Sequence, residues 1–111
     1  MAITIVPLIT PQQVANATTT YLTATKVSYR VDKLTVTNPT ATAATITLYL
    51  VPTAGAAGDS TTISKTKSVG AGETWNCPDF VGQVLGDGTT LQAVASAAAT
   101  LTLSAAGVRI T

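Results

Sequence analysis

The residue types that most often carry out chemistry in proteins are sparse in this 111-residue chain. It has no histidine, which removes the commonest general base and the commonest metal ligand. With Cys77 as its one cysteine, it can form neither a Cys–His dyad nor a four-cysteine zinc site. A single cysteine also cannot close an internal disulfide, which favours a reducing compartment.

Carboxylates are the remaining candidates for acid–base or metal chemistry. The chain has five of them: Asp32, Asp59, Glu73, Asp79 and Asp87. A glycosidase-type pair needs two carboxyl groups about 5–10 Å apart, and the sequence leaves such a pair open. Asp59 and Asp87 stand beside glycines in expected turns, where aspartate has a conformational role and no dense set of oxygen ligands for calcium is present. We therefore expect no enzymatic activity, no bound metal and no cofactor.

Two local clusters offer weaker signals of binding. Trp75, Cys77 and Phe80 could hold a sugar or a partner side chain. In a domain with one tryptophan, however, that side chain more often fills the core or closes the end of a sheet, and we favour this interpretation. Lys65 and Lys67 are expected to point the same way on one strand. They could contact an acidic partner, although solvated surface or protection of a sheet edge is the favoured explanation.

Period-two alternation dominates the elements that must position these residues. In Thr45–Leu50 the aliphatic residues share one face, and two threonines and a tyrosine share the other. Leu34–Thr37 and Leu101–Leu103 repeat this pattern, which is typical of antiparallel sheets with one polar face. Strands are also expected over 62–69 and 73–76, and one helical turn over 78–83.

Turn signals separate the expected strands at regular intervals. They are Asn38-Pro39, the loop 52–60, Gly70–Gly72, Asp87-Gly88 and the segment 96–99. The resulting count of about seven or eight strands predicts an all-β, two-sheet antiparallel sandwich formed by a single domain, residues 1–111. An immunoglobulin-like topology is the first choice and a jelly roll the alternative.

The two ends of the chain depart from simple alternation. Near the C-terminus, Leu101 and Leu103 have one parity and Val108 and Ile110 the other, which predicts a β-bulge near Gly107 that lets both pairs face the core. Residues 1–26 are less regular than the rest. Their apolar positions predict an edge strand or an arm that docks on a partner, and the candidate contact residues are Ile3, Ile5, Leu8 and Ile9, together with Lys65 and Lys67.

Charge and targeting features bear on partners. Only 10% of residues are charged and the net charge is +1, which favours association between copies. Six scattered basic residues do not form the basic face that a nucleic-acid binder needs. The N-terminal segment has no basic region, and Pro7 and Pro11 interrupt it, so we expect synthesis in the cytoplasm, no secretion and no membrane partner.

Several stretches resemble small structural proteins encoded by tailed bacteriophages and prophages. They are Lys33–Asn38, Thr45–Pro52, Gly72–Pro78 and Leu103–Thr111, and the likeness covers roughly residues 30–111 as a pattern, with no diagnostic motif. The resemblance implies a sandwich fold located in the virion, as a capsid decoration or cement protein or as a head–tail or tail component. Its partners would be copies of itself and other virion proteins. The alternative is a fibre- or adhesin-type module that recognises a cell-surface glycan, motivated by the loop 52–60 and by Trp75.

Overall fold

A computed structural model describes residues 3–97 and 100–111 of the chain. The regular structure in this part consists of nine β-strands and two single turns of 3-10 helix. The strands are β1 Ile3–Gln13, β2 Thr19–Thr23, β3 Ser28–Thr37, β4 Ala44–Val51, β5 Thr62–Val69, β6 Thr74–Asn76, β7 Val84–Leu85, β8 Thr90–Ala95 and β9 Thr102–Ile110. The 3-10 turns are η1 Asp59–Thr61 and η2 Pro78–Phe80, and η2 lies where the sequence predicts a helical turn. Among the described residues, no helix has the length and apolar character needed to cross a bilayer.

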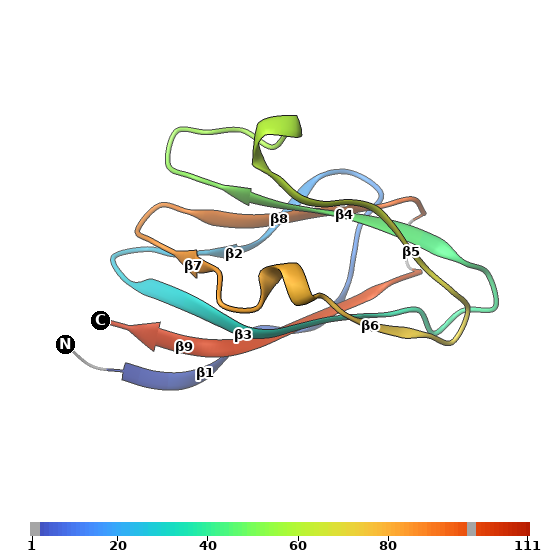
Figure 1. Cartoon of the computed structure of the whole chain (residues 1–111), viewed down its shortest axis with the longest axis horizontal. Helices are drawn as coiled ribbons and strands as arrows, with labels where there is room; N and C mark the ends of the chain where they lie inside the picture. The colour runs from blue at the N-terminus through green and yellow to red at the C-terminus, as the bar shows by residue number, and fades with distance from the viewer. Residues whose placement is uncertain (1–2, 98–99) are drawn as a thin grey trace.

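The strands form two facing antiparallel sheets (Figure 1). Sheet A has the order β1-β9-β3-β6, with β7 also paired to β3, and sheet B has the order β2-β8-β4-β5. The two-sheet antiparallel sandwich that the sequence predicts is therefore confirmed. The strands number nine in the described residues, against the seven or eight expected, because β7 and the two strands before residue 26 are all formed.

The order of the strands is that of a jelly roll, the alternative among the two predicted topologies. An immunoglobulin-like sandwich keeps its first two strands in one sheet, whereas here β1 and β2 lie in different sheets. The strands pair instead as one long hairpin, with β1 against β9, β2 against β8, β3 against β6 and β7, and β4 against β5 at the tip. Rolling that hairpin up brings β9 beside β3 and β8 beside β4, which gives the double sheet of a jelly roll.

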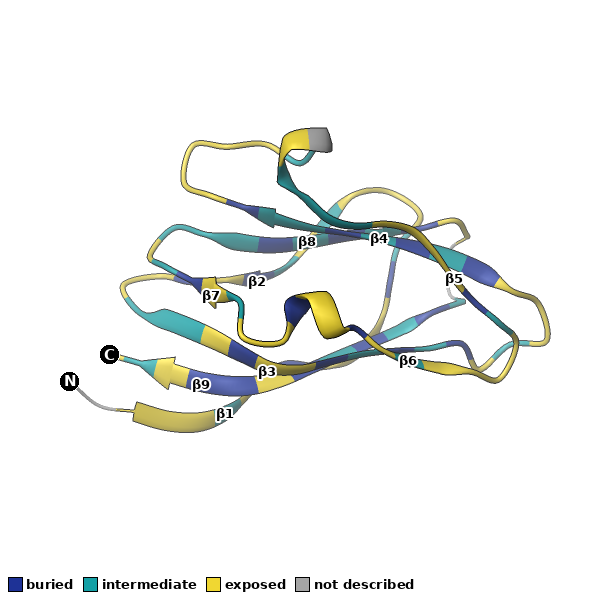
Figure 2. Cartoon of the chain, viewed as in Figure 1, coloured by how far each residue is buried: buried dark blue, intermediate teal, exposed yellow. Residues whose placement is uncertain are grey.

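Alternating side chains form the core between the two sheets. Figure 2 shows the buried positions distributed along the strands of both sheets. In β4, Ile46 and Leu48 are buried while Thr45, Thr47 and Tyr49 lie on the outer face, as the sequence predicts. A β-branched threonine suits a strand and keeps its hydroxyl in water, so sheet B needs no charge on its outer face. The largest fully buried side chains are Phe80, Ile9, Leu34, Ile46, Leu48, Leu85, Leu91, Leu101 and Leu103.

Asn38 closes one end of the sandwich, directly after β3. It is the one polar residue that is buried in the described part of the chain, with no exposed surface. Its Nδ2 donates to the carbonyl oxygens of Thr42 at 2.8 Å and Val69 at 2.9 Å, and its Oδ1 accepts from the backbone N–H and the hydroxyl of Thr40. The backbone of Asn38 also bonds to Glu73 and Gly72. This one residue therefore ties the segment after β3 to the end of β5 through its side chain and to the turn before β6 through its backbone.

The expected bulge near Gly107 exists, but the extra residues stand on the two strands that flank β9. Ala106 and Ala105 pair with Pro7 and Ile9 of β1, which leaves Leu8 as the additional residue. On β3 the additional residue is Asp32, between the partners of Gly107 and Ala106. A Cβ at position 107 would collide with the carbonyl oxygen of Arg30 and lie 2.9 Å from Leu8 Cδ1, so this close approach requires glycine.

The face that the last residues of β9 present differs from the prediction. Because β9 itself is not bulged, its alternation continues, and Leu101 and Leu103 face the core while Val108 and Ile110 do not. Val108 pairs with the exposed residues Ile5 and Arg30, which places it on the outer face of sheet A, where its own side chain is buried with 6% exposure and lies outside the core cluster. The prediction that both apolar pairs face the core was therefore wrong for Val108 and Ile110.

Candidate functional site

Two of the carboxylates that could do chemistry have structural partners. Asp32 Oδ1 accepts from Arg30 Nε at 2.9 Å in a surface ion pair, and Asp87 Oδ1 accepts from the backbone N–H of Lys26 at 2.8 Å. The Asp87 bond shapes the turn that ends at Gly88, whose φ is +85°. Within residues 3–97 and 100–111, no three acidic, cysteine or histidine side chains gather as metal ligands would.

The cluster of Trp75, Cys77 and Phe80 is part of the core, as the favoured interpretation predicts. Cys77 and Phe80 are fully buried, and Trp75 is half-buried and packs against the core. Burial raises the pKa of the Cys77 thiol, because a thiolate is poorly solvated there. The ammonium of Lys67 lies 5.5 Å from the centre of the Trp75 ring. The tryptophan therefore plugs the gap between the edge strands β5 and β6, and Lys67 covers it.

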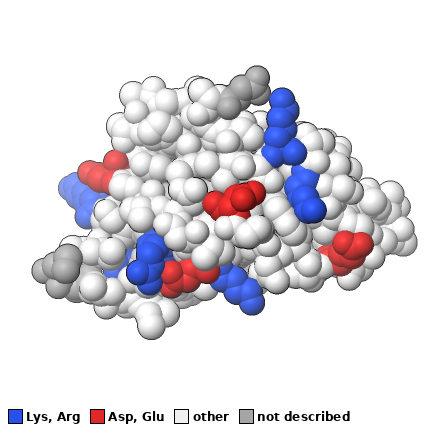
Figure 3. All heavy atoms as spheres, viewed as in Figure 1, with Lys and Arg blue, Asp and Glu red and all other residues white. Residues whose placement is uncertain are grey.

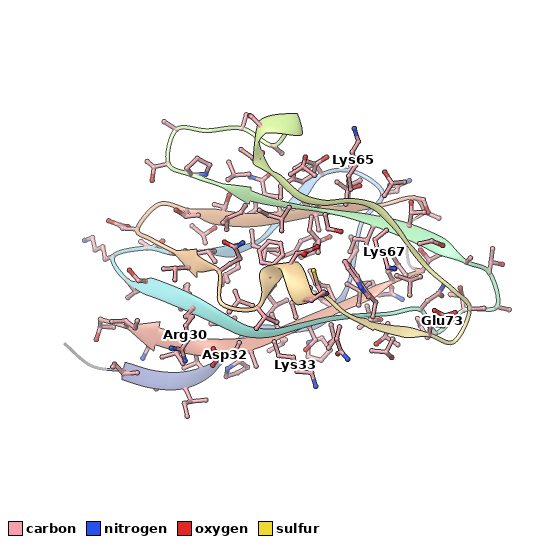
Figure 4. The ribbon with its side chains drawn as sticks, viewed as in Figure 1. Arg30, Asp32, Lys33, Lys65, Lys67 and Glu73 are labelled. Atoms are coloured by element: carbon pink, nitrogen blue, oxygen red, sulfur yellow. The ribbon has the colours of Figure 1, made fainter. Side chains whose placement is uncertain are left out.

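Lys65 and Lys67 do not form the basic pair expected on β5. Thr66, between them, has a φ of +54°, and the pairing with β4 slips between Lys67 and Ser64. A bulge of this kind breaks the alternation of side chains. Figure 4 shows the result: Lys65 points away from the sandwich, while Lys67 lies nearer the centre of the molecule. Both lysines are exposed on the edge strand of sheet B, where charge discourages pairing with another strand.

The N-terminal segment is an edge strand, one of the two forms that the sequence leaves open. Strand β1 pairs with β9 along most of its length and forms one edge of sheet A. Its four candidate contact residues behave differently. Ile9 is buried in its own core and Leu8 is half-buried against it, so neither is available to a partner. Ile3 and Ile5 are 64% and 86% exposed, and Figure 2 shows the start of β1 as an exposed ribbon.

The exposed isoleucines belong to a larger apolar surface on the outer face of sheet A. Residues directly opposite each other in a sheet share a face, and the register gives two such rows. One row runs Ile5, Val108, Arg30 and Val84 across β1, β9, β3 and β7, and the other pairs Ile3 with Ile110. We call the set Ile3, Ile5, Val84, Val108 and Ile110 the outer patch. Its exposed members are Ile3, Ile5 and Val84, while Ile110 is half-buried and Val108 is buried. At about 4.8 Å between strands the patch is roughly 15 Å wide.

The sequence indicates only part of the outer patch. The sequence predicts Ile3 and Ile5 as contact candidates, but the parity of Val108 and Ile110 predicts that their side chains point inward. Val84 lies in a two-residue strand, too short for alternation to be visible. Val84 is nonetheless 55% exposed and stands opposite Arg30. The patch therefore depends on the register between strands that are distant in sequence.

Charged residues lie both within and beside the outer patch, and Arg30 stands between Val108 and Val84 in its longer row. Arg30, Asp32 and Lys33 follow one another along β3, and Figure 4 places all three on the outer side of sheet A. On the face drawn in Figure 3 the charged groups are few and mixed in sign. An open hollow of about 540 Å³ adjoins the patch at Ile110. Its other lining residues are Lys26, Val27, Ser28, Asp87 and Thr111.

Comparison with family models, with curated proteins and with solved structures finds no match to this chain.

Proposed function

We propose that this chain is a non-enzymatic structural protein of a tailed-bacteriophage virion that works by binding copies of itself and other virion proteins. The observation that carries the proposal is the outer patch. Monomeric soluble proteins rarely expose large contiguous apolar surfaces, and a surface of this kind commonly marks a site of interaction with a partner. Here Ile3, Ile5 and Val84 are exposed on one outer face at the edge of a sheet, beside the half-buried Ile110 and the buried Val108.

Charge supports association as the mode of action. The chain has a net charge of +1 and only 10% charged residues, so copies repel one another weakly. Sheet B presents threonine, glutamine and tyrosine on its outer face, including Thr47, Tyr49 and Gln92. A polar face of this kind does not favour association between copies, whereas the apolar outer patch on sheet A favours binding to a partner. The two outer faces therefore suit a subunit with one binding side.

The fold and the sequence resemblance support the virion as the location. Jelly-roll sandwiches are common in viral capsid proteins, as well as in lectin domains. The resemblance to phage structural proteins covers roughly residues 30–111. We place the chain first as a capsid decoration or cement protein, and second as a head–tail or tail component. For the glycan-binding alternative, Trp75 would need an accessible ring, but that ring packs on the core beneath Lys67.

The test is to locate the protein in purified particles of the phage or induced prophage that encodes it. Mass spectrometry of gradient-purified virions measures its abundance relative to the major capsid protein, and imaging of the same particles shows its position. We expect many copies at symmetry-related positions. Absence from the particles, together with a monomeric state in concentrated solution, would refute the proposal.

A further inference from the structure

We infer that the N-terminal half of β1 pairs with the same strand of a second copy, in antiparallel orientation, to join two sheets A into one continuous sheet. The inference rests on the proposed function, that of a protein that acts by association, and names one contact by which two copies would associate. It follows from three features of β1: the direction of its backbone groups, its lack of charge, and the exposed side chains of Ile3 and Ile5.

The position of Pro7 determines which backbone groups of β1 face the open edge. Antiparallel partners alternate between pairs that exchange both hydrogen bonds and pairs that exchange none. Pro7 has no N–H, so its pair with Ala106 belongs to the second kind. Because the two kinds of pair alternate along the strands, Ile5–Val108 and Ile3–Ile110 are also pairs that exchange no hydrogen bonds. The N–H and C=O groups of Ile3 and Ile5 therefore point away from β9, toward the open edge.

The register of a second copy follows from the same proline. When Ile3 stands opposite Ile5 of the second copy, both outward-facing residues of each chain exchange two hydrogen bonds, and Pro7 stays outside the pairing. Shifting the register to place Ile5 opposite itself would bring Pro7 against Ile3, with a ring where the donor should be. The favoured register has a two-fold axis at Thr4, so the contact is closed and self-complementary.

Side chains in this register suit a second copy of the chain. Each Ile3 lies across from an Ile5 on the outer face, and cross-strand pairs of β-branched residues stabilise a sheet. Strand β1 contains no charged residue over Ile3–Gln13, so no like charges oppose each other at the junction. An uncharged strand with isoleucines at alternate positions is the complementary partner, and the chain's own β1 is such a strand.

The other sheet edges are protected against pairing of this kind. Strand β5 carries Lys65 and Lys67 and a bulge at Thr66, which are usual devices against edge pairing. Strand β6 has three residues, and β2 has five with an irregularity between Thr20 and Leu22. The stretch before Pro7 combines regular pairing with β9, outward-facing backbone groups and a lack of charge.

The first experiment measures the dimerisation of the full chain and of two variants by sedimentation velocity from about 1 μM to about 1 mM. Ile5→Pro removes a donor that faces only the second copy, and Ile5→Lys puts charge into the junction. We expect either change to raise the dimer Kd about tenfold or more. Thr10→Lys, on the same strand but beyond Pro7, should leave it unchanged, and circular dichroism should show the same thermal transition for Ile5→Pro monomers as for wild-type monomers.

A second experiment tests the register. Across the proposed axis the two Thr4 residues form a non-hydrogen-bonded pair, with Cα atoms about 4.5 Å apart, which a disulfide can bridge. In a Cys77→Ala background, Thr4→Cys should oxidise to a covalent dimer, and Thr10→Cys should not.

The outcomes separate this inference from the proposed function. A wild-type oligomer that survives Ile5→Pro and resists Thr4→Cys cross-linking would overturn the β1 pairing and leave assembly through another surface in place. A wild-type chain that remains monomeric throughout the concentration range would also overturn the pairing, and the virion proposal would then depend on the particle analysis alone. If a strand from another virion protein cross-links to Thr4→Cys in assembled particles and a second copy does not, the inferred partner is wrong.

Discussion

Replacing Asn38 should reveal how strongly a single buried amide holds the end of the sandwich. Its Nδ2 donates at 2.8 and 2.9 Å to the carbonyl oxygens of Thr42 and Val69. Asn38→Ala removes both bonds and leaves the Val69 carbonyl facing a small void. An unsatisfied buried acceptor costs about 1–3 kcal/mol, and lost packing adds to it, so we expect a loss of about 2–4 kcal/mol. The midpoint of thermal unfolding should fall by at least about 8 °C.

Asn38→Asp provides the sharper test because it keeps the shape and reverses one interaction. A carboxylate oxygen would take the place of Nδ2 and face the two carbonyl oxygens at the same distances, while buried from water. Burial and these acceptors favour the protonated form, so the folded-state pKa of the new carboxyl should lie above its unfolded value of about 3.9. The folded state then binds more protons, and stability is lost as pH rises from the unfolded pKa toward the folded one. The slope is about 1.4 kcal/mol per pH unit in that window.

The assay is urea denaturation between pH 4 and pH 7, followed by the fluorescence of Trp75, the one tryptophan in the chain. The comparison that matters is Asn38→Asp against Asn38→Ala, because their difference cancels the titration of groups that both variants share. We expect Asn38→Asp to lose stability relative to Asn38→Ala over this range, by up to about 4 kcal/mol if its folded pKa exceeds 7. Parallel pH profiles for the two variants, or an Asn38→Asp protein as stable as wild type at pH 7, would refute the reasoning.

Three further substitutions or treatments test other contacts. Gly107→Ala should destabilise the fold by at least about 2 kcal/mol in urea denaturation, because its Cβ collides with the Arg30 carbonyl, which is backbone and cannot move aside alone. Cys77 should react with a disulfide reagent only after unfolding, since burial raises the pKa of its thiol; rapid labelling of the native protein at pH 8 would contradict this. Lys67→Gln should change the emission of Trp75 while lowering stability by less than about 1 kcal/mol, and an unchanged spectrum would argue against the cation–ring contact.

The parts of the fold that the sequence predicts are those determined by local alternation. The faces of β4 follow directly from Ile46 and Leu48 alternating with threonines, because one side of that strand meets the core and the other meets water. Strand β5 has the bounds expected, Thr62–Val69, since a Gly-rich turn ends it. The 3-10 turn at Pro78–Phe80 follows from a proline that suits the first helical position.

Features that depend on contacts between distant segments are not visible in the sequence. The jelly-roll strand order requires β9 to lie between β1 and β3. The residue pattern of a single strand does not determine which strands it will pair with. Asn38 carries a turn signal next to Pro39, but its buried bonds require the end of β5 to lie beside it. The wrong expectation for Val108 arose because the register slips on Leu8 and Asp32, in the partner strands, and not on β9.

The bulge at Leu8 links the interior of the protein to its proposed binding edge. Ile3, Ile5 and Ile9 all have odd numbers, so a regular strand would place them on one face, and Ile9 is in the core. The extra residue at Leu8 reverses the alternation, turning Ile3 and Ile5 to the outer face while Ile9 remains inside. Gly107 makes room for Leu8 at that point. The same local irregularity therefore completes the core and exposes the two isoleucines, so the proposed assembly surface is a consequence of how β1 is fitted onto β9.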